Sequence, residues 1–450
     1  MNKNNIDIEK TIELEKARLQ LENRDQGGMT AYLVSLELPE DDPTEIQESL
    51  QELGALVRTL GDECIGVTVQ KKSKPVPATY IGLGKAEEIK KSCVLLKIDY
   101  VTFDQELSPT QVRNLENLIN KPVLDRTSII LQIFKKNARS KESRTQVEIA
   151  HLEYMAPRLS NAWITWERQR GGGGVGGRVK GAGETQIEID RRRMKDKLAS
   201  LKKDLEKIQK ERETQRKNRL DEWNVVLVGY TNAGKTTLMN ALTESHLSAK
   251  DSLFETLDSS VRRIRGTNNM NILVTDTVGF IRNLPHGLVA SFRSTLEEAS
   301  KADLLIYIVD ISNRSYKDHI KVTDEVLSQV GASDVPKIIV FNKIDSIIGE
   351  PQLPRILARS YPRSICISSH KEEDIRRFRE TIIQFLSQNM VEQTFHVNYG
   401  DSKLLSLIYS HTRVLDANWT SDEGIFKVRM SKSVYQRYFV LGKNEEAQEW

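Results

Sequence analysis

The sequence has few of the residues that mark secreted or membrane-inserted proteins. Its 450 residues include three cysteines, Cys64, Cys93 and Cys366, which lie far apart. An odd number of cysteines without metal-ligand spacing predicts neither a disulfide framework nor a zinc site. No apolar segment follows Met1 as in a secretion signal, and no run approaches the ~20 apolar residues that span a bilayer. We therefore expect a cytoplasmic protein without membrane insertion.

Charge is distributed unevenly along the chain. Hydrophobic residues make up 38% and charged residues 29%, and the length allows two to four domains at ~100–200 residues each. The net charge is +3, but residues 135–220 carry 23 Lys/Arg against 12 Asp/Glu. A charged run is most often a solvated surface. An excess of this size within a nearly neutral chain favours a polyanionic partner such as nucleic acid.

The most specific motif is GYTNAGKT, from Gly229 to Thr236, which fits the phosphate-binding pattern G-x-x-x-x-G-K-[ST]. A predicted buried strand, 225–228, precedes it, and a predicted helix follows it. The glycines allow a tight turn whose N–H groups face an anion at the helix N-terminus. In such a loop Lys235 contacts the β and γ phosphates, and the Thr236 hydroxyl binds Mg²⁺. The residues expected to line this site are Gly229, Tyr230, Thr231, Asn232, Ala233, Gly234, Lys235, Thr236 and Thr237.

Two later motifs indicate GTP. Asp276-Thr277-Val278-Gly279 follows a predicted strand at 271–275, so Asp276 can hold Mg²⁺ and the Gly279 N–H can approach the γ-phosphate. Asn342-Lys343-Ile344-Asp345 follows a predicted strand at 338–341. The Asp345 carboxylate can accept hydrogen bonds from guanine N1–H and its exocyclic amine, a donor pair that adenine lacks.

Four further residues complete this base site. We expect Asn342 to tie its loop to the phosphate loop, and the stem of Lys343 to pack on the base. Ser368 and Ser369 follow another predicted strand, where backbone N–H groups can meet the guanine oxygen. All of these segments lie at the carboxyl ends of strands, where open α/β sheets bind their ligands.

The segment between the phosphate loop and Asp276 contains a candidate switch residue. We expect the Thr256 hydroxyl to complete the Mg²⁺ shell when the γ-phosphate is present, so that its loop orders with GTP and relaxes after hydrolysis. The alternative is an ordinary polar loop. The metal ligands predicted for this chain are therefore Thr236, Thr256 and Asp276. The residues that we assign to this segment of the site are Phe254, Glu255, Thr256, Leu257 and Asp258.

The residue that orients the attacking water in many GTPases is missing. A glutamine often follows the D-x-x-G motif, where this chain has Phe280, whose side chain cannot hold water by hydrogen bonds. We therefore expect slow intrinsic hydrolysis that a partner stimulates. Asn232 is a candidate ligand for K⁺, which offsets phosphate charge in some GTPases without the glutamine. The alternative is that Asn232 only satisfies backbone groups. The residues predicted to act in catalysis are Asn232, Lys235, Thr256 and Gly279.

Residues 1–137 are predicted to form a small α/β domain. Alternating strands and helices favour a parallel sheet. Gly82-Leu83-Gly84-Lys85 precedes one of these helices, as either a tight turn or a second phosphate site. The strands are predicted at 31–36, 64–69 and 100–103, and the helices at 43–60, 86–95 and 109–118.

Residues 138–220 are predicted to form an antiparallel helical hairpin. Helices at 141–157 and from Gln186 flank a long loop with eight glycines between Gly171 and Gly183. The second helix has an apolar seam at heptad spacing: Met194, Leu198, Leu201, Leu205 and Ile208. The loop combines glycines with groups for stacking and for phosphate contact, which suits irregular RNA, and the alternative is a flexible tip without a ligand. These groups are Trp163, Trp166, Arg168, Arg170, Arg178 and Lys180.

The expected fold class is α/β. A P-loop GTPase domain at 221–390 follows the small α/β domain and the hairpin, and a small α/β domain at 391–450 ends the chain. The last domain has no catalytic signature. Its strands are predicted at 394–398 and 425–430, and its helices at 402–409 and 433–439.

Three features together resemble the HflX family of translation-associated GTPases. They are Gly183-Glu184-Thr185-Gln186 before an acidic and basic helix start, the segment FETLD at 254–258, and the segment DTVGFI at 276–281. The domain order is similar to that of the family over most of the chain. One departure is Ala182, where the family often has a proline, and the glycine tract is also heavier than usual.

The resemblance implies binding to the large ribosomal subunit and its RNA, with the hairpin tip near the peptidyl-transferase region. It also implies GTP-linked splitting, rescue or biogenesis of ribosomes, notably under stress. We expect the protein to be a monomer off the ribosome. The alternative is a GTP-dependent adaptor that docks on a protein through the hairpin. An ATPase or kinase is disfavoured by the segment from Asn342 to Asp345.

Overall fold

The computed structural model describes residues 28–170, 186–217, 222–243, 253–254, 257–258, 260–264, 270–282, 298–347, 352–388, 390–420, 423–431, 435 and 439. The chain divides into two compact units, each with its own contacts. Unit 1 comprises Met1–Lys207, Lys250–Asp258 and Ile281–Ser294, and unit 2 comprises Ile208–Ala249, Ser259–Phe280 and Thr295–Trp450. The four-part division expected from the sequence stays a prediction.

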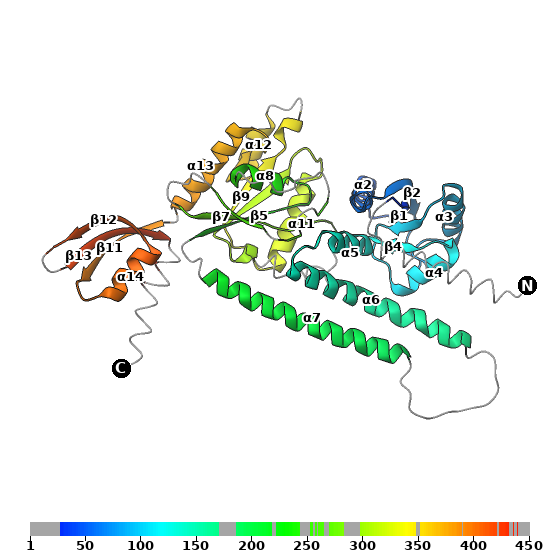
Figure 1. The fold of residues 1–450 in the computed structure, drawn as a ribbon. Coiled ribbons are helices and arrows are strands. Elements are labelled where there is room, and N and C mark those ends of the chain that lie inside the picture. The colour runs from blue at the N-terminus through cyan, green and yellow to red at the C-terminus, as the bar shows by residue number, and fades with distance from the viewer. Residues whose placement is uncertain are drawn as a thin grey trace, which may run out of the picture. The chain divides into compact units, whose positions relative to one another are not determined.

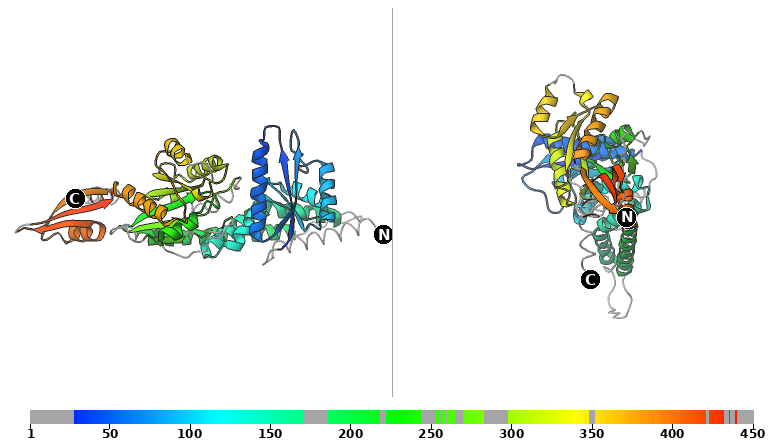
Figure 2. Two further views of the ribbon diagram at one scale, coloured as in Figure 1. Left: turned by 90° about the horizontal axis from the view of Figure 1, so that it is seen from above. Right: turned by 90° about the vertical axis from the view of Figure 1, so that its left-hand side faces the viewer.

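Unit 1 contains a parallel sheet with the strand order β2-β1-β3-β4. Helices α2 and α5 pack together on one side of it, and α3 packs against α4 on the other (Figure 2). Helix α2 starts at Pro43 after the N-cap Asp42 and ends before Gly61, whose φ of 93° is left-handed. The elements are β1 (Thr30–Glu37), α2 (Pro43–Leu60), β2 (Glu63–Lys71), α3 (Leu83–Leu95), β3 (Tyr100–Phe103), α4 (Pro109–Ile119), β4 (Val123–Asp125) and α5 (Arg126–Asn137).

The expected parallel α/β pattern of this region is confirmed. All three predicted strands and all three predicted helices are present, with ends that differ by a few residues. The prediction missed β4 and α5, because β4 has three residues and passes directly into α5. Asp125 ends the strand and caps the helix, since its side chain accepts the N–H of Ser128.

Two long helices, α6 (Lys141–Arg170) and α7 (Gln186–Lys217), lie side by side (Figure 1). Lys202 and Glu153 join them at 2.8 Å, and Lys197 pairs with Glu148. In α7, the five apolar seam residues are partly buried, whereas most of their neighbours are exposed. The glycine-rich segment 171–185, with Arg178 and Lys180, lies outside the described residues.

The sequence prediction ended the first hairpin helix too early. Helix α6 continues through Pro157, so Trp163, Trp166, Arg168 and Arg170 belong to helical backbone. A proline removes one hydrogen bond of a helix and is costly there, but tertiary contacts can outweigh this cost. Arg158 supplies such contacts, since its Nη2 donates to the Leu107 carbonyl and to Asp125 at 2.8 and 3.1 Å.

Unit 2 contains a six-stranded sheet with the order β10-β9-β8-β5-β7-β6. All neighbours are parallel except β6, which runs antiparallel to β7. Its central strands are almost fully buried, as expected for a parallel sheet between helices. The elements are β5 (Trp223–Gly229), α8 (Lys235–Thr243), β6 (Ser260–Arg263), β7 (Ile272–Asp276), β8 (Leu304–Asp310), α11 (Tyr316–Gln329), β9 (Lys337–Asn342), η1 (Ile344–Ser346), α12 (Leu353–Ser360), β10 (Ser364–Cys366) and α13 (Glu372–Gln388).

The chain continues into a separate antiparallel sheet with the order β11-β13-β12. Its core includes Phe426 and Val428 from the sheet. Ile408, from the helix that covers the sheet, packs against them. The prediction found two of these strands and the helix, but it missed β12. Of the helix expected at 433–439, only Tyr435 and Phe439 are among the described residues. The elements are β11 (Met390–Asn398), α14 (Ser402–His411), β12 (Arg413–Trp419) and β13 (Glu423–Ser431).

Candidate functional site

The glycine-rich loop joins β5 to α8, as the motif predicts. Gly229 has a φ of 148°, and a Cβ there would lie 2.2 Å from the carbonyl oxygen of Ile308. Gly234 has a φ of 92°, and a Cβ there would lie 2.3 Å from Asn342 Nδ2. Both positions therefore require glycine. Asn232 lies between them with a left-handed φ of 60° and an exposed side chain.

Lys235 is the first residue of α8 and is buried. Its Nζ donates to the carbonyl oxygens of Tyr230 and Gly229, at 2.8 and 3.2 Å. Burial lowers the pKa of Lys235 to about 8, although the nearby Asp276 opposes this shift. The ammonium group is thus held inside the loop by carbonyl groups that an incoming phosphate can replace.

The two predicted Mg²⁺ ligands of unit 2 contact each other. Thr236 Oγ1 donates to Asp276 Oδ2 at 2.7 Å, and Asp276 is fully buried at the end of β7. A hydroxyl and a carboxylate are hard oxygen donors, which fit Mg²⁺. Within the described ranges, no group of three or more His, Cys, Asp or Glu could hold a metal ion. An ion at this pair would therefore take its remaining ligands from phosphate and water, as Mg²⁺ commonly does.

Gly279 lies against the phosphate loop. A Cβ there would lie 2.8 Å from Lys235 Nζ and 2.8 Å from Thr231 Cα. The Thr231 hydroxyl is buried and has no hydrogen-bond partner in the part of the chain that the structure describes. Buried polar groups normally have partners, so an unsatisfied hydroxyl beside a lysine and a glycine N–H fits a ligand oxygen.

Phe280 is a structural residue of this site. Its side chain is buried, and its backbone bridges the loop, since Thr231 N donates to Phe280 O and Phe280 N donates to Gly229 O, at 2.8 and 3.1 Å. The neighbouring Thr277 hydroxyl donates to Leu227 O at 2.7 Å. The segment from Asp276 to Phe280, which includes Val278, is therefore bonded to β5 before Gly279 and to the phosphate loop after it.

Asn342 joins the base motif to the phosphate loop. Its Nδ2 donates to Ala233 O at 2.9 Å, and its Oδ1 accepts from the N–H and hydroxyl of Ser369, at 3.1 and 2.8 Å. Lys343 has a φ of 62° and its Nζ lies 2.8 Å from Asp310 Oδ2.

The Asp345 carboxylate, which the sequence predicts to recognise guanine, is charged at neutral pH. The Ser368 hydroxyl donates to Asp345 and lowers its pKa, with smaller contributions of the same sign from His370 and Lys371, while burial opposes the shift. Two lone-pair oxygens are what a guanine N1–H and amine require. The structure thus gathers the predicted residues of the phosphate loop, the D-x-x-G motif and the base motif at one edge of one sheet.

The segment Leu253–Asp258 has its recorded contacts in unit 1. Phe254 and Leu257 are buried, the Phe254 carbonyl accepts from Asn137, and the Asp258 carboxylate accepts from Ser140. Glu255 and Thr256 lie outside the described residues. The expected part of this segment in nucleotide binding stays a prediction.

One aromatic contact of the loop was not predicted. The ring of Tyr230 stacks on His319 of α11, with centroids 3.7 Å apart and planes 6° from parallel. The two residues are far apart in sequence, and neither belongs to a motif with the other, so no sequence signal pairs them.

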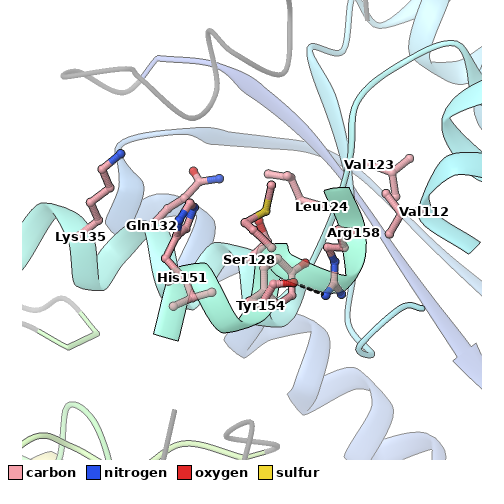
Figure 3. Close-up of a pocket in the computed structure, with 11 residues that line it drawn as sticks. Val112, Val123, Leu124, Ser128, Gln132, Lys135, His151, Tyr154 and Arg158 are labelled. Atoms are coloured by element: carbon pink, nitrogen blue, oxygen red, sulfur yellow. Dashed lines mark hydrogen bonds between the residues drawn. The ribbon is translucent and has the colours of Figure 1, made fainter. Parts of the chain in front are cut away.

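Unit 1 contains a separate pocket between α4, α5 and α6 (Figure 3). Tyr154 and Arg158 lie at one end, and Lys135, Gln132 and His151 gather at the other. Arg158 is fixed by Asp125, so this end is a buried ion pair. The glycine-rich turn at 82–85 does not line the pocket, and Lys85 pairs with Glu88 at 2.6 Å. A second phosphate site at this turn stays a prediction.

Comparisons with known proteins match this order of elements. Three family models match in sequence: GTP-binding GTPase N-terminal at residues 47–135, GTP-binding GTPase Middle Region at 137–219, and 50S ribosome-binding GTPase at 224–343. No described helix has the length and apolar character needed to cross a membrane.

Several curated relatives are similar over most of their length. A GTPase HflX of Gluconacetobacter diazotrophicus is 39% identical over 89% of this chain and 94% of that protein. The GTPase HflX of Escherichia coli K12 is 36% identical over 89% of this chain and 93% of that protein. The GTPase HflX of Flavobacterium psychrophilum is 45% identical over 67% of this chain and 72% of that protein.

Proposed function

Because the chain belongs to the HflX family of GTPases, we propose that it is a GTP-hydrolysing factor that binds the large ribosomal subunit. Its action there is the splitting, rescue or biogenesis of ribosomes, with greatest demand under stress. GTP hydrolysis itself follows from the family and from its P-loop GTPase domain. We place the protein in the cytoplasm as a monomer that joins the ribosome in its GTP form.

The observation that carries this proposal is the position of Asn342. Its side chain contacts Ala233 of the phosphate loop and Ser369 of the base loop, so one amide sets the spacing between a triphosphate site and a guanine site. Asp345 next to it is charged, as recognition of guanine requires.

We assign the following roles to the site residues in hydrolysis. Lys235 and the loop N–H groups bind the β and γ phosphates, and the Gly279 N–H donates to the γ-phosphate as charge develops there. Thr236, Asp276 and Thr256 hold Mg²⁺, which neutralises phosphate charge when bound. Phe280 cannot orient water, because its side chain is buried. The proposal therefore requires a group from the ribosome for fast turnover.

A bound K⁺ is the second electrostatic contribution that we propose. Asn232 is exposed and has a left-handed φ of 60°, and we propose that its amide oxygen is a ligand of the ion. Equal turnover rates in Na⁺ and K⁺ buffers would exclude this role. A tenfold higher rate in K⁺, lost in Asn232→Ala, would support it.

The binding partner is tested by sedimentation. The protein is centrifuged with separated ribosomal subunits, with GDP or with a non-hydrolysable GTP analogue. We expect co-sedimentation with the large subunit alone, stronger with the analogue, and steeply weaker at high salt because phosphate contacts release counterions. Association that survives both RNase and high salt would instead support docking on a protein.

A further inference from the structure

The ring of Tyr230 contacts a side chain from outside the glycine-rich loop. It stacks on the imidazole of His319, with ring centroids 3.7 Å apart and planes 6° from parallel. Tyr230 is buried and His319 is half-buried, so the contact is largely protected from water. A contact between two aromatic rings stabilises beyond the burial of their area. The first turn of α11 thus holds one side chain of the phosphate loop.

His319 lies on a part of α11 that is attached to the sheet. Its N–H donates to Ser315 O at 3.0 Å within the first turn of the helix. One residue later, the Ile320 carbonyl accepts the buried Tyr307 hydroxyl of β8 at 2.5 Å. Helix α11 packs against β5 as well as β8 (Figure 1). The imidazole is therefore fixed relative to β5, the strand that leads into the phosphate loop.

The carbonyl of Tyr230 accepts two hydrogen bonds that close the loop. Lys235 Nζ donates to it at 2.8 Å, and the Ala233 N–H donates to it at 3.3 Å. The backbone bridge to Phe280 also lies at Tyr230. A change in the orientation of the Tyr230 peptide would therefore move the acceptor of Lys235.

The loop needs such contacts because glycine gives it conformational freedom. Two of its glycines have φ values of 148° and 92°, and glycine loses more conformational entropy on ordering than any other residue. A loop that is ordered before its ligand arrives loses less entropy on binding. Asn342 holds this loop at the Ala233 carbonyl, and His319 holds it at the Tyr230 ring.

We propose that His319 is a positioning residue for nucleotide binding, because its ring keeps Tyr230, and with it the acceptor of Lys235, in the conformation that receives phosphate. This role rests on the proposed function, in which Lys235 binds the β and γ phosphates. The β-phosphate is common to GDP and GTP, so the contact acts on both nucleotides. The contact requires a flat ring, so another aromatic residue can replace the histidine.

The test measures the affinity of the full chain for fluorescent GDP in Mg²⁺. We expect His319→Leu to weaken binding about tenfold, or about 1.4 kcal/mol, because leucine fills the space without a ring. His319→Phe should stay within about twofold of the wild type, since it restores the stack. Combining His319→Leu with Tyr230→Leu should weaken binding no more than the stronger of the two single effects, since both remove one contact.

The pH profile of GDP binding separates positioning from a general loss of stability. Burial lowers the pKa of Lys235 to about 8, and a loop without its stack admits water, which relieves this effect. The fall in affinity with rising pH should therefore move upward by about half a pH unit in His319→Leu, and return to the wild-type position in His319→Phe. Uniform weakening without this shift would mean that His319 only stabilises the fold.

The matched control is Tyr399→Leu. Tyr399 stacks on Trp419 in the separate antiparallel sheet, with centroids 5.3 Å apart and planes 24° from parallel, so this variant also removes a stacked aromatic pair. We expect it to bind GDP as the wild type does. Wild-type affinity in His319→Leu, or equal weakening in His319→Leu and His319→Phe, would overturn the proposal. A wild type that binds no GDP would instead remove the proposed function.

Discussion

The side-chain amide of Asn342 donates a hydrogen bond of 2.9 Å to the carbonyl oxygen of Ala233. This bond passes the position that a side chain on Gly234 would occupy, since a Cβ there would lie 2.3 Å from Asn342 Nδ2. Both groups are buried, so the bond is shielded from water. The loop predicted to bind phosphate and the loop predicted to bind the base are therefore joined at a position that requires glycine.

Replacing that glycine should abolish nucleotide binding. Gly234→Ala forces a residue with a Cβ into a φ of 92° and displaces the Asn342 amide, so we expect affinity for GTP and GDP to fall more than ~100-fold, which corresponds to about 2.7 kcal/mol. The measurement is a titration with fluorescent nucleotide. Gly400→Ala is the control, since a Cβ there meets nothing within 4 Å. Retained binding in Gly234→Ala would contradict the assigned loop geometry.

Replacing one carboxylate oxygen of Asp345 by an NH₂ group should shift the preference from guanine to xanthine nucleotides. Asp345→Asn replaces an acceptor oxygen by a donor NH₂, which opposes the N1–H and amine of guanine but suits the oxygen of xanthine. We expect GTP affinity to fall at least tenfold and xanthosine triphosphate affinity to rise. Competition between the two nucleotides measures the ratio. A ratio equal to that of the wild type would discredit the base-site assignment.

The pKa of Lys235 predicts a pH dependence of binding. Its pKa of about 8 lies below the ordinary 10.5, so the lysine loses its charge as pH rises through about 8, and affinity for GDP should fall between about pH 7 and about pH 8.5. Lys235→Met should bind weakly at both pH values, without this dependence. An affinity that is flat over this range in the wild type would contradict the low pKa.

The lowered pKa of Lys235 should also make the stability of the folded protein depend on pH. Between about pH 8 and 10.5 the unfolded chain binds a proton at Lys235 that the folded protein does not, so unfolding free energy of the nucleotide-free protein rises with pH in this window. Urea unfolding at several pH values, compared with Lys235→Met, isolates this contribution. A fall attributable to Lys235 would refute it.

The buried pair of Asp125 and Arg158 should matter more for stability than an exposed pair. Asp125→Ala leaves the Arg158 guanidinium buried without its counter-charge, which costs about 3–5 kcal/mol of unfolding free energy. Asp324→Ala removes the half-exposed pair with Lys337 and should cost no more than about 1 kcal/mol. Denaturant unfolding of both variants measures the two losses of unfolding free energy. Equal losses would contradict the prediction that the buried pair contributes more.

Local patterns were sufficient to predict most of the fold and the nucleotide motifs. The phosphate loop, the Asp276 motif and the Asn342 motif each occupy a short stretch with a strand before it, so their chemistry is visible in sequence. The parallel sheet of unit 1 follows from alternating strands and helices. These features depend on residues close together in the chain, where spacing alone carries the information.

The remaining features depend on distant partners. Helix α6 continues past Pro157 because Arg158 reaches Asp125, and a proline without that partner would predict a helix end. The stacking of His319 on Tyr230 and the bonds of Asp258 to Ser140 join residues that no periodicity relates. Strand β4 is too short for an alternation signal. These features depend on tertiary contacts, so they could not be predicted from local sequence patterns.

The backbone bridge of Phe280 to Gly229 and Thr231 has a mechanical consequence. The Phe280 peptide follows Gly279, which we propose contacts the γ-phosphate, and two hydrogen bonds join it to the phosphate loop. A shift of either segment therefore strains or breaks bonds of the other. Under the proposed assignment of Gly279, loss of the third phosphate therefore also disturbs the hydrogen bonds of the phosphate loop.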